Sequence, residues 1–237
     1  MDIETFKQIS KNRESDQKHI TKHFTELTDS IPILKQFRDL VEKEVYGFGE
    51  RAFLSMHKMI LDSFEKNDIK FLEIGVYKGQ LLSLYRLLES ICAKSIDVYG
   101  ITPLDSSDGH IESDYLQNIH DLHDIFKLKY PIIIKGLSQD GIVIDIAGAI
   151  SPFDVIVIDG SHQYEDVKSD LENYSKMVSV GGYLIMDDSA NDLPGAYWGE
   201  FWGIAEVTKA TVEFFINNSD WEYIGNVVHN KIYKRIK

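Results

Sequence analysis

Hydrophobic residues follow helical spacing in the N-terminal part of the chain. Ile20, Phe24, Leu27 and Ile31 recur with the spacing of helix turns, and a similar set follows further on. This spacing places apolar side chains on one face of a helix. Because no run in residues 1–66 is convincing as a strand, we expect a helical extension there that closes over a substrate. The second set consists of Phe53, Met56, Ile60 and Phe64.

From Ile69 onward, short apolar runs alternate with amphipathic stretches of helix length. The runs are IKFLEI, IDVYGI, PIIIKG, DVIVID and GYLIMDD. Such alternation predicts βαβ units and an α/β fold whose parallel sheet is buried on both faces. Between the last two runs we expect a crossover helix that ends at Gly181. Its buried face is predicted to carry Val167, Leu171, Tyr174 and Val178.

The end of the chain changes pattern again. WEYIGNVVHNKIYKRIK predicts two strands in a hairpin around His229 and Asn230, at the edge of the sheet. Before it, a segment with Pro and Gly begins as a loop and becomes a helix near Ile204. Long loops beside a sheet often form lids or substrate walls. Tyr197, Trp198 and Trp202 in this loop are candidates to stack on an acceptor, although core packing or a dimer contact explains them equally well.

Composition limits the kinds of partner. The chain has 237 residues and a net charge of −13, which indicates one substantial domain that repels nucleic acid and anionic membrane surfaces. The N-terminus lacks a basic start followed by an apolar core, and nowhere do 18 apolar residues run together. We therefore expect a soluble cytoplasmic protein. With Cys92 as its single cysteine, the chain forms no internal disulfide.

A glycine turn follows the first apolar run. FLEIGVYKGQ places Glu73, Gly75, Tyr77 and Gly79 between a buried strand and a helix. The free N–H groups of that helix would bind an anionic group such as a carboxylate, and the glycines would let the backbone approach it. A plain tight turn needs the same glycines. The spacing fits neither a Walker A loop nor the dinucleotide-binding fingerprint.

This turn resembles the first motif of class I S-adenosylmethionine-dependent methyltransferases, and the resemblance runs from about Ile69 to the C-terminus. It implies a methyltransferase domain at 67–237 with a Rossmann-like, mostly parallel seven-stranded sheet, helices on both faces and a C-terminal antiparallel hairpin. Thr102 stands where family members commonly carry a ribose-binding acid. Asp105 or Asp108 could reach the ribose from the following loop, with Asp105 preferred, although either could equally be a solvated loop acid. The cofactor-binding residues implied by the resemblance are Glu73, Gly75, Tyr77, Gly79, Thr102, Asp105, Ser138, Gln139 and Asp159.

Three acids end two of the predicted strands. Asp159 ends DVIVID, while Asp187 and Asp188 end YLIMDD. Carboxylates that share a crevice repel each other unless a cation compensates, and an all-oxygen set suits Mg²⁺ or another hard divalent ion. Alternatively, each acid caps the turn that follows it. The set resembles that of the metal-dependent catechol-type O-methyltransferases.

A closer resemblance covers IDGSHQYEDVKSDL and GGYLIMDDS. Both segments look like the macrolide and aminocoumarin sugar O-methyltransferases of the macrocin, mycinamicin and novobiocin group, and like the related cephalosporin hydroxylase family. In the mycinamicin type, a histidine three residues after the first metal acid is the general base, and His162 has that position here. Tyr164 is either a substrate contact or part of the next helix. The group also implies a possible homo-oligomer.

The sequence therefore predicts a metal-dependent O-methyltransferase that acts on a hydroxyl of a sugar or glycoside, in antibiotic or surface-glycan biosynthesis. Two alternatives remain open. A phenol or catechol O-methyltransferase shares the metal chemistry but needs a flatter, more aromatic pocket. A methyltransferase-like fold that binds cofactor or metal without methyl transfer, hydroxylase-type relatives included, has the same sheet.

Overall fold

The computed structural model describes residues 1–10, 13–104, 114–193 and 201–237. Within these ranges, helices and strands alternate from residue 68 onward, as the apolar runs predict, and the predicted α/β fold is confirmed. The first part of the chain is helical, and no strand occurs among its described residues up to 66. Its helices are α1 Ile3–Ser10, α2 Arg13–Ser30, α3 Pro32–Glu44 and α4 Arg51–Asp62.

Seven strands in the described ranges form one sheet in the order β3-β2-β1-β4-β5-β7-β6. The first five are parallel, while β7 runs antiparallel to both β5 and β6. The predicted hairpin at the sheet edge is confirmed, with β6 as the outermost strand. The strands are β1 Asp68–Ile74, β2 Ser95–Thr102, β3 Ile132–Lys135, β4 Phe153–Ile158, β5 Val178–Met186, β6 Trp221–Val227 and β7 Asn230–Arg235.

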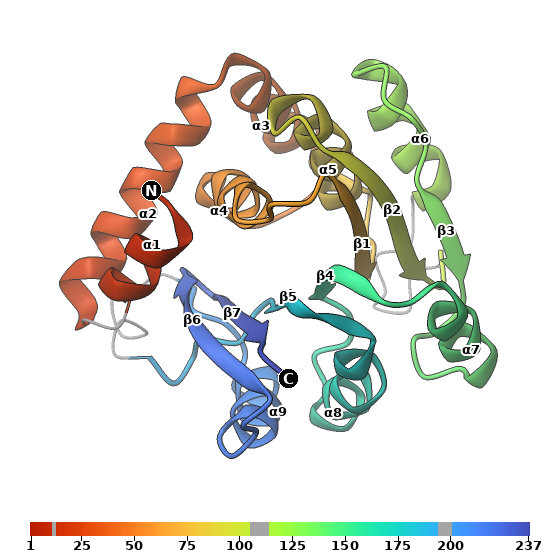
Figure 1. Cartoon of the computed structure of the whole chain (residues 1–237). Coiled ribbons are helices and arrows are strands. Elements are labelled where there is room, and N and C mark those ends of the chain that lie inside the picture. Colours follow the sequence, from red (N-terminus) through yellow and green to blue (C-terminus); the bar gives the residue numbers. More distant parts are fainter. Residues whose placement is uncertain (11–12, 105–113, 194–200) are drawn as a thin grey trace.

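Helices cover both faces of this sheet, and the strand pleat divides the core between them. Phe71 belongs to the cluster of buried residues that includes side chains of α1 to α6, whereas its neighbour Leu72 belongs to the cluster that includes side chains of α7 to α9, because successive strand residues point to opposite faces. Figure 1 shows these two groups of helices on either side of the sheet. Glu73 therefore points to the same side as Phe71, toward α4 and α5. These remaining helices are α5 Gln80–Ile91, α6 Tyr115–Ile125, α7 Gly141–Ile150, α8 Tyr164–Tyr174 and α9 Ala205–Phe215.

The crossover helix is shorter than expected. α8 ends at Tyr174, a 3₁₀ turn η1 covers Ser175–Met177, and Val178 already belongs to β5, where it pairs with Phe153. The prediction that Val178 lies on the helix face is therefore wrong. Its spacing from Tyr174 fits a helix by coincidence, while its extended backbone and full burial are those of a strand residue.

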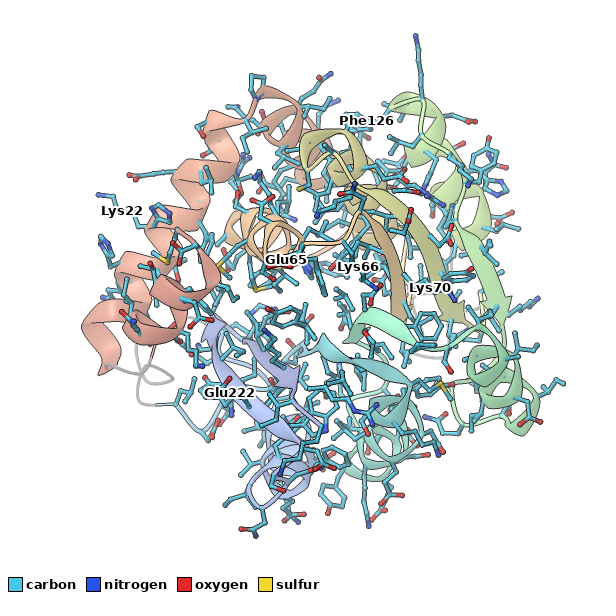
Figure 2. All side chains as sticks on the ribbon, viewed as in Figure 1. Lys22, Glu65, Lys66, Lys70, Phe126 and Glu222 are labelled. Carbon is cyan, nitrogen blue, oxygen red and sulfur yellow. The ribbon has the colours of Figure 1, made fainter. Side chains whose placement is uncertain are left out.

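The N-terminal helices share one hydrophobic core with the sheet. Phe6 and Ile20 belong to the same cluster of buried residues as Ile224 on β6. An ion pair of 2.5 Å between Lys7 Nζ and Glu222 Oε1 adds a polar link from α1 to β6, where Figure 2 labels Glu222. The predicted domain boundary between residues 66 and 67 thus stays a prediction. Buried residues on both sides of it belong to one hydrophobic cluster. In the described part of the chain, no helix is both long and apolar enough to span a bilayer.

The amino ends of the strands are closed by a structural polar network. Buried Asp154, on β4, accepts hydrogen bonds from Lys66 Nζ at 2.6 Å, from the backbone N–H of Lys70 at 2.9 Å and from Ser179 Oγ at 2.8 Å. Figure 2 shows both lysines near the start of β1. Both carboxylate oxygens of Asp154 have protein partners, so this network does not need a ligand. In open α/β sheets ligands bind at the opposite edge, where the carboxyl ends of the strands lie.

Candidate active site at the carboxyl edge of the sheet

The strand register brings the glycine turn and the acids together. Ile74 of β1 lies beside Ile158 of β4, which in turn lies beside Met186 of β5. The residues that follow these three positions therefore emerge side by side at the carboxyl edge. They are Gly75, Asp159 and Asp187.

A cavity of about 350 Å³ opens at this edge. This volume lies within the range of small-ligand pockets. The cavity is bounded by the carboxyl ends of β1, β4 and β5, by the start of α5, and by the connection between α3 and α4. The predicted site residues that line it are Glu73, Gly75, Tyr77, Gly79, Asp159, His162, Asp187 and Asp188.

Gly75 and Gly79 are each required to be glycine by a different feature of the turn. Gly75 has a φ of +93°, and a Cβ there would collide with the backbone carbonyl of Asp159. Gly79 has a φ of +83° and is the N-cap of α5, which has no side-chain cap. Since no side chain of the described residues caps this end, the first N–H groups of α5 are available to an anionic group in the cavity. The tight turn is required by the protein itself, in addition to any requirement from a ligand.

Glu73 is a buried carboxyl group at the base of the cavity. It is 5% exposed, and its Oε2 has no hydrogen-bond partner among the described atoms. Burial, with a smaller contribution from the charge of Asp187, raises the pKa of Glu73 to about 8. A buried acid that lacks a partner in the protein is poised for a ligand donor or cation.

Substitution of Glu73 by glutamine is expected to stabilise the ligand-free protein above pH 7. Because the folded pKa is raised, the unfolded chain ionises near pH 4.5 while the folded carboxyl keeps its proton until about pH 8, and stability falls across this window. Urea unfolding should show Glu73→Gln to be more stable than wild type by roughly 1–3 kcal/mol at pH 8, and by less at pH 5. Exposed Glu65→Gln is the control. An equal increase in the free energy of unfolding at pH 5 and pH 8 would contradict the raised pKa of Glu73.

The acid pair at the end of β5 is joined by a histidine from the β6–β7 turn. His229 Nε2 lies 3.2 Å from Asp187 Oδ1 and 3.8 Å from Asp188 Oδ1. Among the described residues, potential metal-ligating atoms of Asp187, Asp188 and His229 all lie within 4.8 Å of one another. Asn230 Nδ2 also donates a hydrogen bond of 2.6 Å to Asp187 Oδ1. The hairpin turn thus completes one side of the acid cluster.

The acids at this edge do not ionise independently. Burial and the charges of its neighbours raise the pKa of Asp159, which donates a hydrogen bond to Asp187. Burial also raises the pKa of Asp188 to about 6, with a further contribution from Asp187. At Asp187 burial acts to raise the pKa, but the hydrogen bond and charge of His229, together with hydrogen bonds from the Asp188 backbone and from Asp159, lower it. A divalent cation would relieve this crowding, and the carboxylate oxygens present fit one.

His162 lies on the outer side of the same cluster. Its Nε2 is 3.4 Å from Asp188 Oδ2, and its side chain is 47% exposed. His229, in contrast, has only 7% of its side chain exposed. His162 is therefore the histidine of this pair whose ring is open to a molecule in the cavity.

Five predicted site residues do not line the cavity. Thr102 is buried, and its Oγ1 donates a 3.0 Å hydrogen bond to the carbonyl of Val76. The carbonyl of Ser138 accepts a hydrogen bond from Tyr174 Oη, and Gln139 Nε2 donates one to Asp170 Oδ1. These contacts tie the turn after β3 to α8. The other two residues, Tyr164 and Trp202, are described next.

Tyr164 and Trp202 also make other contacts. The Tyr164 hydroxyl donates a 2.5 Å hydrogen bond to Glu213, and the ring lies under Lys209, so this residue packs α8 against α9. Trp202 is 6% exposed and belongs to the interior rather than to an open wall. The remaining predictions lie outside the described residues, namely Asp105, its alternative Asp108, Tyr197 and Trp198.

Several cavity residues were not predicted from the sequence. His229 and Asn230 come from the hairpin turn, and their only signal was a pair of polar residues inside an apolar segment. His57 on α4 lines the cavity in its neutral form, since burial lowers its pKa to about 3, and its Nδ1 lies 3.0 Å from Tyr85 Oη. Phe48 stacks on Tyr77 at 5.5 Å between ring centroids, which joins the α3–α4 connection to the glycine turn.

Comparison with known proteins assigns the class. Residues 72–189 match the model of a family described as a methyltransferase domain. A protein of Acanthamoeba polyphaga mimivirus, described as uncharacterized, is 31% identical over 147 residues, which make up 60% of this chain and 62% of that protein. The chain thus matches less than two thirds of that relative's length.

Two solved structures illustrate the fold. One is a Staphylococcus aureus protein whose proposed assignment is caffeoyl-CoA O-methyltransferase, with a TM-score of 0.62, 16% identity and coverage of 93% of this chain and 98% of that one. The other is MycE from the mycinamycin biosynthetic pathway, in complex with Mg, SAH and mycinamycin VI. Its TM-score is 0.52 at 21% identity, and the match covers 84% of this chain and 54% of that one.

The chain therefore carries a methyltransferase domain and has the fold of the class I S-adenosylmethionine-dependent methyltransferases. The class predicted from the glycine turn is confirmed, and so is the mostly parallel sheet that ends in an antiparallel hairpin. The matched segment runs from β1 to the end of β5, and thus contains both the glycine turn and the three acids.

Proposed function

We propose that this protein is a metal-dependent O-methyltransferase that transfers the methyl group of S-adenosylmethionine to a hydroxyl of a sugar or glycoside. One observation carries the proposal: the glycine turn and the cluster around Asp187 and Asp188 line the same cavity. A methyl donor held by the turn and an acceptor held at the acids would meet there. The proximity of two bound reactants is a large part of catalysis in a displacement reaction.

The first part of the cavity suits the cofactor. The uncapped N-terminus of α5 faces the cavity and would hold a carboxylate, while the unpartnered carboxyl group of Glu73 would receive an ammonium group. The amino-acid moiety of S-adenosylmethionine carries both groups. The apolar rings of Tyr77 and Phe48 flank this region.

The second part suits the acceptor. When bound, the cofactor supplies an electrophilic methyl group, and the cation supplies Lewis-acid polarisation of the acceptor hydroxyl. Asp187 and Asp188, with Asp159 beside them, would hold that cation. His162 would take the hydroxyl proton on Nε2 as the new C–O bond forms and the C–S bond breaks. Asp188, 3.4 Å from His162 Nε2, would stabilise the imidazolium that results.

The walls of the cavity favour an acceptor with a ring. Aromatic side chains line it from four segments: Tyr46 and Phe48 before α4, Phe53 on α4, Tyr77 in the glycine turn and Phe201 after β5. Such side chains pack against the apolar face of a sugar, but they pack equally well against a phenol. A phenol or catechol acceptor is therefore the second candidate, and the aromatic lining is the observation that favours it.

An acceptor panel separates the two candidates. The full chain would be incubated with methyl-labelled S-adenosylmethionine, a divalent cation and either a set of glycosides or a set of catechols. We expect label in the glycoside fraction and its loss when a chelator removes the cation. Label confined to the catechols would replace the first candidate by the second, and chelator-resistant transfer would contradict metal dependence.

A further inference from the structure

The β6–β7 turn places the imidazole nitrogen Nε2 of His229 beside Asp187 and Asp188. Met186 pairs with Lys231 in the antiparallel register of β5 and β7, so the residues after Met186 lie opposite those before Lys231. The backbone N–H of Ser189 donates a 2.9 Å hydrogen bond to the His229 carbonyl, which fixes the turn against the end of β5. His229 is thus positioned by the sheet itself rather than by a loop.

The ring of His229 is packed between aromatic side chains and has polar neighbours at Nε2. The rings of Phe53 and Phe201 meet it edge-on at 4.8 Å and 5.2 Å between centroids. His229 is 5% exposed, and its Nδ1 has no hydrogen-bond partner among the described atoms. Among the described residues, Nε2 faces the carboxylates of Asp187 and Asp188.

The backbone of the β6–β7 turn is strained at Val228. Its φ is +48°, a region that a β-branched residue rarely adopts, whereas Asp188, at +50°, has a φ that aspartate tolerates. An ordinary two-residue hairpin turn would carry asparagine and glycine instead. Local strain of this kind is retained where the surrounding structure needs a particular placement of side chains. Here it accompanies the approach of His229 to the acids.

One separation is that of two ligands on one ion. Two atoms bound at about 2.1 Å in tetrahedral or octahedral geometry lie about 3.0–3.4 Å apart. His229 Nε2 is 3.2 Å from Asp187 Oδ1, within this range, and 3.8 Å from Asp188 Oδ1, which would have to move closer on an ion. Two carboxylates and a neutral imidazole also balance the charge of a divalent cation.

We propose that His229 Nε2 is a ligand of the cation beside Asp187 and Asp188, and that the site consequently prefers a transition ion such as Mn²⁺ or Co²⁺ to Mg²⁺. The inference deepens the proposed function and rests on its metal dependence. Imidazole nitrogen suits first-row transition ions, whereas Mg²⁺ prefers oxygen donors. The all-oxygen set predicted from the sequence would discriminate less strongly between these ions and Mg²⁺.

The test is pulsed EPR of the metal-stripped full chain loaded with Mn²⁺ alone. Wild type should show ¹⁴N couplings from a bound imidazole, and both His229→Ala and His229→Phe should lose them. The phenylalanine variant keeps a ring beside Phe53 and Phe201, so one of the two should fold. His162→Ala and the exposed His19→Ala should retain the couplings.

Competition between the ions gives a second readout. Loss of His229 should weaken Mn²⁺ binding by at least about tenfold and Mg²⁺ binding much less, because only the transition ion gains from nitrogen. Retention of ¹⁴N couplings without His229, or equal losses for both ions, would overturn the inference. In that outcome the metal-dependent transfer measured with the acceptor panel would still stand. A chain that binds neither ion would contradict both proposals.

Discussion

Replacing Asp188 by asparagine is expected to lower metal-dependent methyl transfer by at least about 100-fold, because even residues that only support a metal ligand commonly contribute 10- to 100-fold. Asparagine has nearly the same shape and, like aspartate, tolerates the positive φ of +50° at this position. It removes the negative charge that the cation would need. Metal affinity and kcat should fall together, while binding of S-adenosylmethionine at the glycine turn should change little.

The melting temperature of Asp188→Asn separates chemistry from folding. Burial and the charge of Asp187 raise the pKa of Asp188 to about 6, so its ionised form is unfavourable in the ligand-free protein. The variant should therefore be at least as stable as wild type at pH 8. Asp62→Asn, which breaks an exposed pair with Lys58, is the control and should keep full activity. Full activity of Asp188→Asn would remove the acid cluster from the mechanism.

Replacing His162 by alanine is expected to reduce kcat by about 10²–10⁴-fold, the usual contribution of a general base. The affinity for the cation and the KM for S-adenosylmethionine should change much less, because the side chain lies on the open side of the cluster, 47% exposed. Activity of the variant should rise with pH, since hydroxide can take over the missing base. The measurement is the dependence of kcat on pH from 6 to 9.

Two outcomes would contradict the role of His162. Wild-type kcat across this pH range would exclude it as the base. A fall in metal affinity as large as the fall in kcat would show instead that it holds the cation. His19→Ala, on the exposed face of α2, controls for the loss of a histidine elsewhere and should behave as wild type.

The sequence predicted those parts of the site that depend on short-range pattern. Gly75 and Gly79 were predicted in the turn because a tight strand-to-helix turn needs positive φ at fixed positions. Asp159, Asp187 and Asp188 were predicted to lie together because acids directly after buried parallel strands must reach the same edge of the sheet. All five line one cavity, and their roles stay predictions. The glycine turn could be predicted from local spacing, and the acid cluster from the rule that parallel strands end at the same edge of a sheet.

Other parts depend on contacts between distant segments. The approach of His229 to Asp187 follows from the antiparallel register of β5 and β7, which no local pattern encodes. Val178 fits a helix by spacing, and only its pairing with Phe153 makes it a strand residue. Thr102 was expected at the cofactor because of its place in the motif, yet its hydroxyl is satisfied by the backbone of Val76.

The central claim is that one cavity binds both S-adenosylmethionine and a divalent cation for methyl transfer. Calorimetric titration of the full chain with S-adenosylmethionine, with and without Mg²⁺ or Mn²⁺, tests it most directly. We expect one cofactor per chain under both conditions, and binding of a cation that Asp188→Asn abolishes. The absence of cofactor binding in every condition would contradict the account.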